Sequence, residues 1–164
     1  MILEANAELL EQAAQLLSTI DHVSYTRAAP LFDGQRIGGH IRHVIEFYEG
    51  LARGLAEGHV DYDARRRDPE IESNREAAIV RLRCLAALLR NDSRFRSNRS
   101  IQVAGEGSGY AESSVARELQ AICSHTVHHF ALIAVLLRFY GRPVPSGFGV
   151  SKATLEYRAT QAAA

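Results

Sequence analysis

The sequence is poor in several residue types, and each shortage excludes a class of protein. Its 164 residues include two cysteines, no tryptophan and, at Lys152, a single lysine. Two cysteines cannot form the disulfide framework of a small secreted protein, and both Cys84 and Cys123 lie among apolar neighbours, so we predict buried, reduced thiols. Only four prolines and twelve glycines occur, which excludes collagen and low-complexity polymers. The composition is that of a soluble globular protein.

Excess charge is also absent, because 19 basic residues balance 19 acidic ones. A nucleic-acid partner is therefore not expected. The first residues include Glu4 and lack the basic region of a secretory signal. The most apolar run, Phe130 to Leu137, is far shorter than the roughly 20 residues that span a bilayer. We expect a cytoplasmic protein with no membrane partner.

What the sequence does have is helical periodicity. Apolar residues recur at spacings of three and four over residues 3–20, 36–56, 69–91 and 114–140. Asp68-Pro69-Glu70 is a typical helix start, and Ser113 or Ser114 can cap the last long helix. Four amphipathic helices predict an all-α four-helix bundle with long crossover loops, in one domain of residues 1–164 with a C-terminal tail at 142–164.

Two shorter segments depart from this pattern. The helical period is lost between residues 91 and 113, where 100–104 resembles a strand and the glycines after it resemble turns, so a small β-hairpin is predicted there. In the tail, Ser151 can cap a last short helix.

The histidines are the most informative residues, because five of the seven fall in two groups. His125 and His129 are four residues apart, about 40° on a helical wheel, so both point into the bundle. His128 falls at the edge of the polar face. Two imidazoles at this spacing can bind one cation such as Zn²⁺ or Ni²⁺. An isolated pair is equally consistent with core histidines that bond to protein groups.

The second group, His40 and His43 in the segment 36–56, could complete a three-histidine site with one position open to water or substrate. The helical wheel places His40 nearer the centre of the apolar stripe. Periodicity alone thus favours His40 as the more inward of the two, but geometry inferred from the sequence does not decide which of them completes the site.

The segment Ile37-Gly38-Gly39-His40-Ile41-Arg42-His43 and the segment Ser124-His125-Thr126-Val127-His128-His129 together resemble the DinB-like (YfiT-like) superfamily. The resemblance extends over most of the chain. It implies a four-helix bundle, a homodimer, and a divalent metal (Zn, Ni or Fe) held by His43, His125 and His129, with His40 as a neighbour. The charged stretch Asp61–Glu72 and the segment Phe148–Ser151 resemble an uncharacterised subset of the superfamily.

The resemblance also implies an activity, because better-studied relatives are metal-dependent enzymes that use a thiol or water. We therefore expect an S-transferase, isomerase or hydrolase whose partner is a small-molecule substrate, with a low-molecular-weight thiol as one candidate. The alternatives are a non-catalytic metal- or ligand-binding dimer and a plain bundle with structural histidines.

Other candidates have a weaker basis. Glu118 lies roughly 10.5 Å along the helix from His125, too far to share a metal. A buried pairing with an arginine or an exposed position is favoured for it, and a role beside the metal ligands or toward the substrate is the alternative. The run Arg65-Arg66-Arg67 could hold substrate carboxylates, although a solvated loop paired with nearby acids is the commoner arrangement. Tyr48 and Tyr110 are interpreted as packing residues.

Overall fold

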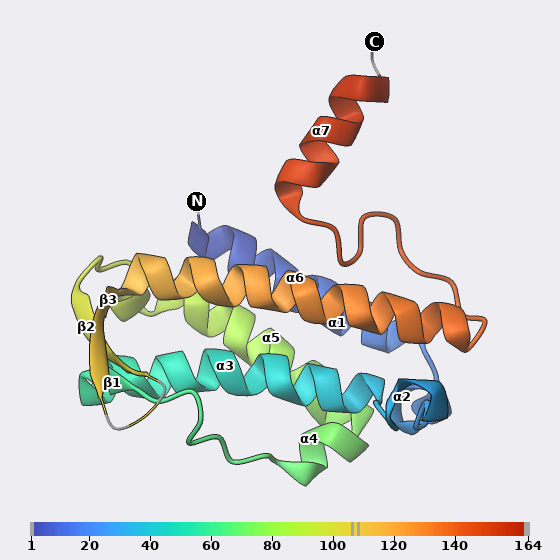
Figure 1. Ribbon diagram of the computed structural model, residues 1–164, viewed down its shortest axis with the longest axis horizontal. Helices are drawn as coiled ribbons and strands as arrows, with labels where there is room; N and C mark the ends of the chain where they lie inside the picture. The colour runs from blue at the N-terminus through green and yellow to red at the C-terminus, as the bar shows by residue number, and fades with distance from the viewer. Residues whose placement is uncertain (1, 106, 108, 163–164) are drawn as a thin grey trace.

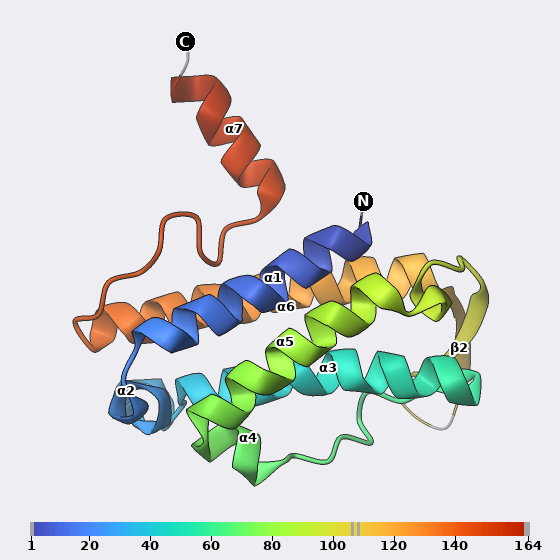
Figure 2. The ribbon, with the colours of Figure 1, turned by 180° about the vertical axis from the view of Figure 1, so that it is seen from behind.

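The apolar stripes of four long helices meet in one hydrophobic core. The computed structural model describes residues 2–105, 107 and 109–162. The long helices are α1 (Ile2–Thr19), α3 (Ile37–Glu57), α5 (Arg75–Asn91) and α6 (Val115–Phe139). α1 packs against α5 and α6, and α3 packs against the same two helices (Figures 1 and 2). The predicted four-helix bundle is confirmed.

The core consists of aliphatic side chains with a few aromatic rings, and its largest fully buried members come from all four long helices and from α2 (His22–Thr26). Burying one such side chain stabilises the fold by about 1.5–3 kcal/mol. The set is Tyr25, Tyr48, Phe130, Leu10, Leu17, Ile37, Ile41, Ile45, Leu51, Leu55, Leu82 and Leu89.

A buried polar network fixes the register of three of these helices. The hydroxyl of Tyr48 in α3 donates to Oδ1 of Asn6 in α1 at 2.7 Å and lies 3.2 Å from the hydroxyl of Thr126 in α6. The Asn6 amide donates to the main-chain oxygen of Leu119 at 3.2 Å. Because buried polar groups are costly when unpaired, this network favours one alignment of α3 against α6.

The helix predicted over residues 69–91 is two helices, which corrects the sequence prediction. α4 (Pro69–Ser73) ends at Asn74, and α5 begins after it. Asn74 has extended backbone angles, and its side chain accepts a hydrogen bond from the amide of Ala77 at 3.2 Å. An N-cap residue lies outside the helical region, so this cap breaks the helix. The predicted caps at Asp68 and Ser114 are present.

The predicted hairpin is present as β2 (Ser100–Ala104) and β3 (Tyr110–Ser114), which pair antiparallel with Gln102 opposite Glu112. A third strand, β1 (His59–Val60), was not predicted and pairs parallel with β2. The sheet order is β1-β2-β3, and it lies across one end of the bundle (Figure 1). β1 directly follows α3, and β3 directly precedes α6. These two helices carry the two groups of histidines, so the sheet joins one end of each.

The remaining elements are short or peripheral. α2 and the 3₁₀ turn η1 (Pro30–Phe32) connect α1 to α3, and η2 (Ser93–Phe95) follows α5. The predicted short tail helix is α7 (Lys152–Ala162), which projects away from the bundle (Figure 2).

In the part of the chain that the structure describes, α6 is long and apolar enough to cross a membrane by length and composition. The same composition suits the core helix of a bundle, and α6 packs against α1 and α3 with part of that apolar stretch buried.

Candidate metal centre

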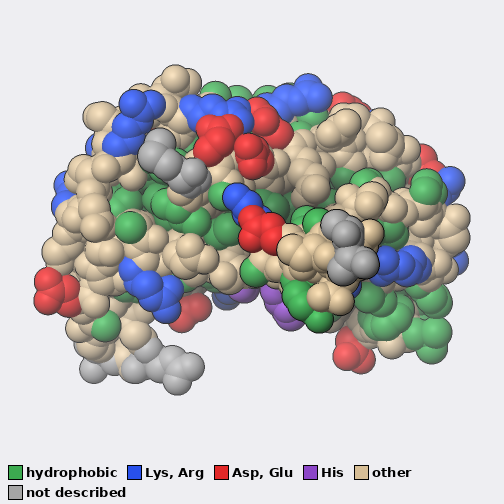
Figure 3. Space-filling model, turned by 90° about the horizontal axis from the view of Figure 1, so that it is seen from above, with side chains coloured by type: hydrophobic (Ala, Val, Ile, Leu, Met, Phe, Trp, Pro, Cys, Tyr) green, Lys and Arg blue, Asp and Glu red, His purple; other side chains and the backbone are tan. Residues whose placement is uncertain are grey.

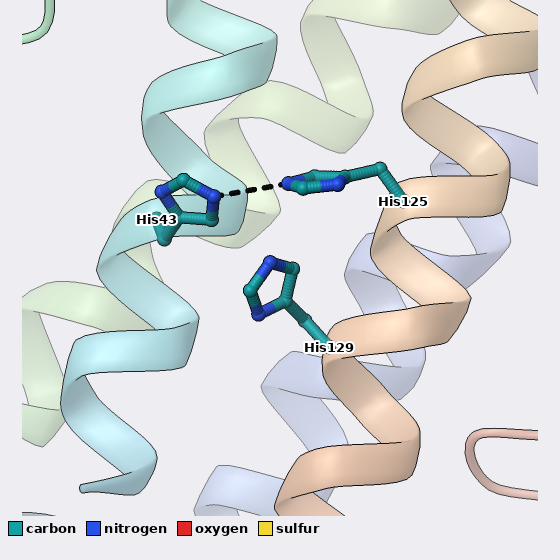
Figure 4. A group of neighbouring side chains, drawn as sticks. All are labelled: His43, His125 and His129. Atoms are coloured by element: carbon teal, nitrogen blue, oxygen red, sulfur yellow. Dashed lines mark hydrogen bonds between the residues drawn. The ribbon is translucent and has the colours of Figure 1, made fainter. Parts of the chain in front are cut away.

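Three half-buried imidazoles converge between two helices of the bundle. His43 projects from α3, and His125 and His129 project from successive turns of α6 (Figure 4). One nitrogen from each ring lies within 4.8 Å of the other two. Nε2 of His43 lies 3.0 Å from Nε2 of His125. The structure thus brings together the three residues that the family resemblance implies.

The spacing fits a small divalent cation. Bonds of about 2.1 Å at tetrahedral angles place two ligand nitrogens roughly 3.4 Å apart. The His43–His125 separation is close to that value. A small movement of the His129 ring toward the other two would bring its nitrogen to a similar distance from both. Three ligands leave one tetrahedral position for water or substrate, which is the pattern of catalytic rather than structural zinc sites. The triad could therefore hold a metal ion.

His40 is the most buried of the four histidines in this region, as the helical wheel indicates, but it lies behind His129 rather than in the triad. Its Nε2–H donates to Oε1 of Gln35 at 3.0 Å, so its Nδ1 is an acceptor. That atom lies 2.9 Å from Nδ1 of His129, which must therefore donate. The chain of two bonds leaves Nε2 of His129 unprotonated and facing the triad, as metal-binding histidines require.

The opposite tautomer is set at His43. A guanidinium N–H of Arg65 donates to Nδ1 of His43 at 3.1 Å, so His43 carries its proton on Nε2 and donates it to Nε2 of His125. Metal binding through Nε2 of His43 requires that proton to leave. Arg65 therefore stabilises the tautomer of His43 that cannot bind a cation through Nε2.

Burial keeps the cluster neutral. It lowers the pKa of His43 to about 4, with a further contribution from the Arg65 charge, and it lowers the pKa of His129 to about 3, with further contributions from His125 and His43. Burial is also the main cause of the lowered pKa values of His40 and His125. Neutral imidazole is the metal-binding form, so the three rings of the triad have the charge state that a cation requires at neutral pH.

An aromatic wall closes one side of the triad. The ring of Phe47 lies 4.3 Å from that of His125 and 4.8 Å from that of His43, between ring centroids. Tyr62 stacks on Phe47 at 5.0 Å, and its hydroxyl donates to Oε2 of Glu118 at 2.9 Å. Burial, followed by the negative charge of Glu118, raises the pKa of Tyr62, so its phenol stays protonated.

The two favoured expectations for Glu118, an arginine pairing and an exposed position, are wrong. Its carboxylate is neither exposed nor paired with an arginine among the described residues; it is buried and accepts hydrogen bonds from Tyr62 and from the Ser113 hydroxyl, the latter at 2.5 Å. The prediction that Glu118 lies too far along the helix to share the metal with His125 agrees with its absence from the triad. Tyr62 was missed because it lies in a loop, where no periodicity indicates which way a side chain points.

Arg65 departs from the expected solvated loop. It lies over the ring of Phe47, 5.4 Å from the centroid, and its Nε is buried without a hydrogen-bond partner. Within the described chain, the run 65–67 forms no ion pair with the nearby acids. Arg66 and Arg67 are exposed.

The other candidates lie away from the triad. Tyr48 is a core phenol, and Tyr110 is exposed beside His59. Cys84 is exposed rather than buried, because α5 packs against its neighbours through its other face, while Cys123 is half-buried and burial raises its pKa. His128 is exposed, as expected from its place at the edge of the polar face. Histidine side chains reach the surface at one edge of the molecule (Figure 3).

Comparison with known proteins adds evidence for the fold. Neither a protein-family model nor a curated protein matches the sequence. Among solved structures the chain is similar to YfiT from Bacillus subtilis, described as a probable metal-dependent hydrolase with an unusual four-helix bundle topology. The two share 19% identity with a TM-score of 0.54, over 87% of this chain and 85% of YfiT. At the level of the fold the resemblance is confirmed: the chain shares the four-helix-bundle fold of YfiT.

Proposed function

We propose that this chain is a metal-dependent enzyme in which His43, His125 and His129 hold a divalent cation of the Zn, Ni or Fe type. The observation that supports it best is the convergence of three imidazoles within 4.8 Å, beside a hollow that two of them line. A bound cation of this kind supplies Lewis acidity and lowers the pKa of a water or thiol that it binds.

The chain's own residues would prepare that site. Gln35 and His40 hold His129 with its Nε2 lone pair toward the triad. Phe47 and Tyr62 cover one side and exclude water there, so a substrate would approach from the side where a hollow adjoins His43 and His129. Excluding water strengthens the electrostatic interactions within the site.

Hydrolysis is the reaction class that we place first, because YfiT, which shares the fold, is described as a probable metal-dependent hydrolase. S-transfer and isomerisation with a low-molecular-weight thiol would use the same open position. The substrate in each case would be a small molecule, because the hollow beside the triad measures about 330 Å³.

A non-catalytic metal-binding role is the second candidate, and one observation favours it. Among the described residues, no carboxylate forms a hydrogen bond with any of the four clustered histidines. An acid or base for proton transfer would therefore have to be a histidine or come from the substrate.

The experiment that separates these candidates is a turnover screen of metal-loaded protein. It would offer small esters and amides, and then electrophiles with several thiols, to the wild type, to His129→Ala and to His128→Ala. Turnover that is lost in His129→Ala and kept in the exposed control His128→Ala supports an enzyme. Stoichiometric metal with no turnover in any arm supports the binding protein.

We also propose that the chain forms a homodimer, supported by α7. This helix of 11 residues is exposed along its whole length, including Leu155 and Tyr157, and isolated helices of this length are marginal in water. Hydrophobic side chains also lie at the surface on the side to which α7 projects (Figure 3). Sedimentation analysis of the wild type and of Tyr157→Glu tests this. A monomeric wild type would contradict it.

A further inference from the structure

A hollow of about 330 Å³ opens beside the histidine triad, at the first turn of α3. His40, His43 and His129 form part of its lining, and Arg36, Arg42 and Glu72 line it with them. The hollow therefore combines the open side of the triad with charged groups from α3 and α4.

The charged groups are arranged around one carboxylate. Glu72 lies between two arginines, with Oε1 3.5 Å from a terminal nitrogen of Arg36 and Oε2 3.2 Å from Nε of Arg42. The second contact is close enough for an ion pair but is not aligned as a hydrogen bond, so the buried Nε–H of Arg42 has no hydrogen-bond partner. A buried N–H without a partner is costly, and an incoming anion would satisfy it.

The backbone around Glu72 is packed against α3, whereas its carboxylate is held, among the described residues, only by the two arginines at the edge of the hollow. A Cβ at Gly38 would overlap the main-chain oxygen of Glu72, so α4 sits directly on α3 because residue 38 is glycine. The buried hydroxyl of Tyr25 fixes the same helix by donating to the main-chain oxygen of Ile71 at 2.6 Å. The side chain of Glu72 is 30% exposed, so the carboxylate and its arginine partners can be reached from solvent. The fold thus presents two arginines whose shared carboxylate can be exchanged.

The charge balance of the region favours an anion. Two arginines and Glu72 leave one net positive charge beside three neutral imidazoles, and a divalent cation in the triad would add two more. Arg65, on the other side of His43, adds another. A neutral or cationic substrate would leave this charge uncompensated in a half-buried site.

We propose that the hollow binds a carboxylate group of the substrate, with Arg36 and Arg42 as its binding residues and Glu72 as the internal carboxylate that it displaces. The group would lie next to His43 and His129, so the rest of the substrate would extend over the open side of the triad. Carboxylate is the matching chemistry because the two arginines already surround a carboxylate of this chain.

This inference deepens the proposed function and rests on it, because the bound carboxylate is taken to belong to the enzyme's substrate. Binding of a carboxylate by the arginines does not itself require a metal. Its test therefore uses metal-free protein. Propionate, or its neutral isostere propionamide, is titrated at constant ionic strength, and the backbone amide signal of Gly39, which lines the hollow, is followed by NMR. The variants are Arg42→Gln, Arg36→Gln, Glu72→Gln and the control Arg81→Gln, an arginine on α5 paired with Glu49.

We expect propionate to shift the Gly39 signal and propionamide to leave it unchanged. Arg42→Gln should weaken binding about tenfold and Arg36→Gln by less, because Arg36 is more exposed. Glu72→Gln should tighten it several-fold, and Arg81→Gln should leave it unchanged. Equal binding of propionamide, or unchanged affinity in both Arg42→Gln and Arg36→Gln, would overturn the proposal. Metal content is measured separately. It shows whether the proposed metal site fails together with the carboxylate-binding proposal or remains when that proposal fails.

Discussion

Arg65 should weaken metal binding, and replacing it by glutamine should strengthen it. The guanidinium donates to Nδ1 of His43 at 3.1 Å. Adding the width of the imidazole and a metal–nitrogen bond of about 2.1 Å places it roughly 7 Å from a cation on Nε2. At an effective dielectric constant of roughly 40–80, a unit charge and a divalent ion at that distance repel by about 1–2 kcal/mol.

A second effect acts in the same direction. Once Nε2 of His43 binds a cation, the ring proton belongs on Nδ1, where it would face the N–H of Arg65. Glutamine offers a carbonyl oxygen that can accept that proton. Together the two effects predict zinc binding about tenfold tighter, or more, in Arg65→Gln.

The assay is competition for zinc between the protein and a chromophoric chelator, at fixed pH and ionic strength. Arg66→Gln is the matched control, because it removes the same charge from a neighbouring exposed residue. Zinc affinity in Arg65→Gln that is equal to or weaker than in the wild type would refute the reasoning. An equal gain in Arg66→Gln would assign the effect to net charge rather than to contact with His43.

Three further predictions concern stability. Tyr48→Phe removes a buried donor from the network that joins three helices, so the free energy of unfolding in urea should fall by about 1–2 kcal/mol. Gly38→Ala should lower the melting temperature, because its methyl group overlaps the main chain of α4, whereas Gly39→Ala, which has room there, should change it little. The pKa values of His43 (about 4) and His129 (about 3) lie below that of an unfolded histidine, so unfolding takes up protons. Stability of the metal-free protein, measured by urea titration, should therefore decline as the pH falls from about 6.5 to 4, and less steeply in His129→Gln.

Features of the fold that depend on local chemistry could be predicted from the sequence. The apolar period of three and four predicted the long helices. The cap at Ser114 marked the start of α6, and the cap at Asp68 marked the start of the short α4. The spacing of His125 and His129 within one helix placed both rings on one face, since helix geometry alone determines it. The break at Asn74 was missed because an asparagine inside an otherwise helical pattern caps a helix only when its backbone turns extended.

Features that depend on how helices meet could not be derived in this way. His40 and His43 both face α6, and periodicity favoured the more buried His40. The position of α3 along α6 is what places His43 in the triad and His40 behind His129. Tyr62 and Arg65 reach the site from a loop without periodicity, so their contacts with Phe47 and His43 emerge only in three dimensions.

Metal content per chain tests the central claim most directly. Untagged protein purified without chelator, and reloaded with Zn²⁺, Ni²⁺ or Fe²⁺, would be measured by mass spectrometry beside His43→Ala, His125→Ala and His40→Ala. We predict nearly one metal ion per chain in the wild type, its loss in the first two variants, and retention with weaker affinity in His40→Ala. A wild type that retains none of these metals after loading would contradict the account, as would a His43→Ala variant that binds metal as tightly as the wild type.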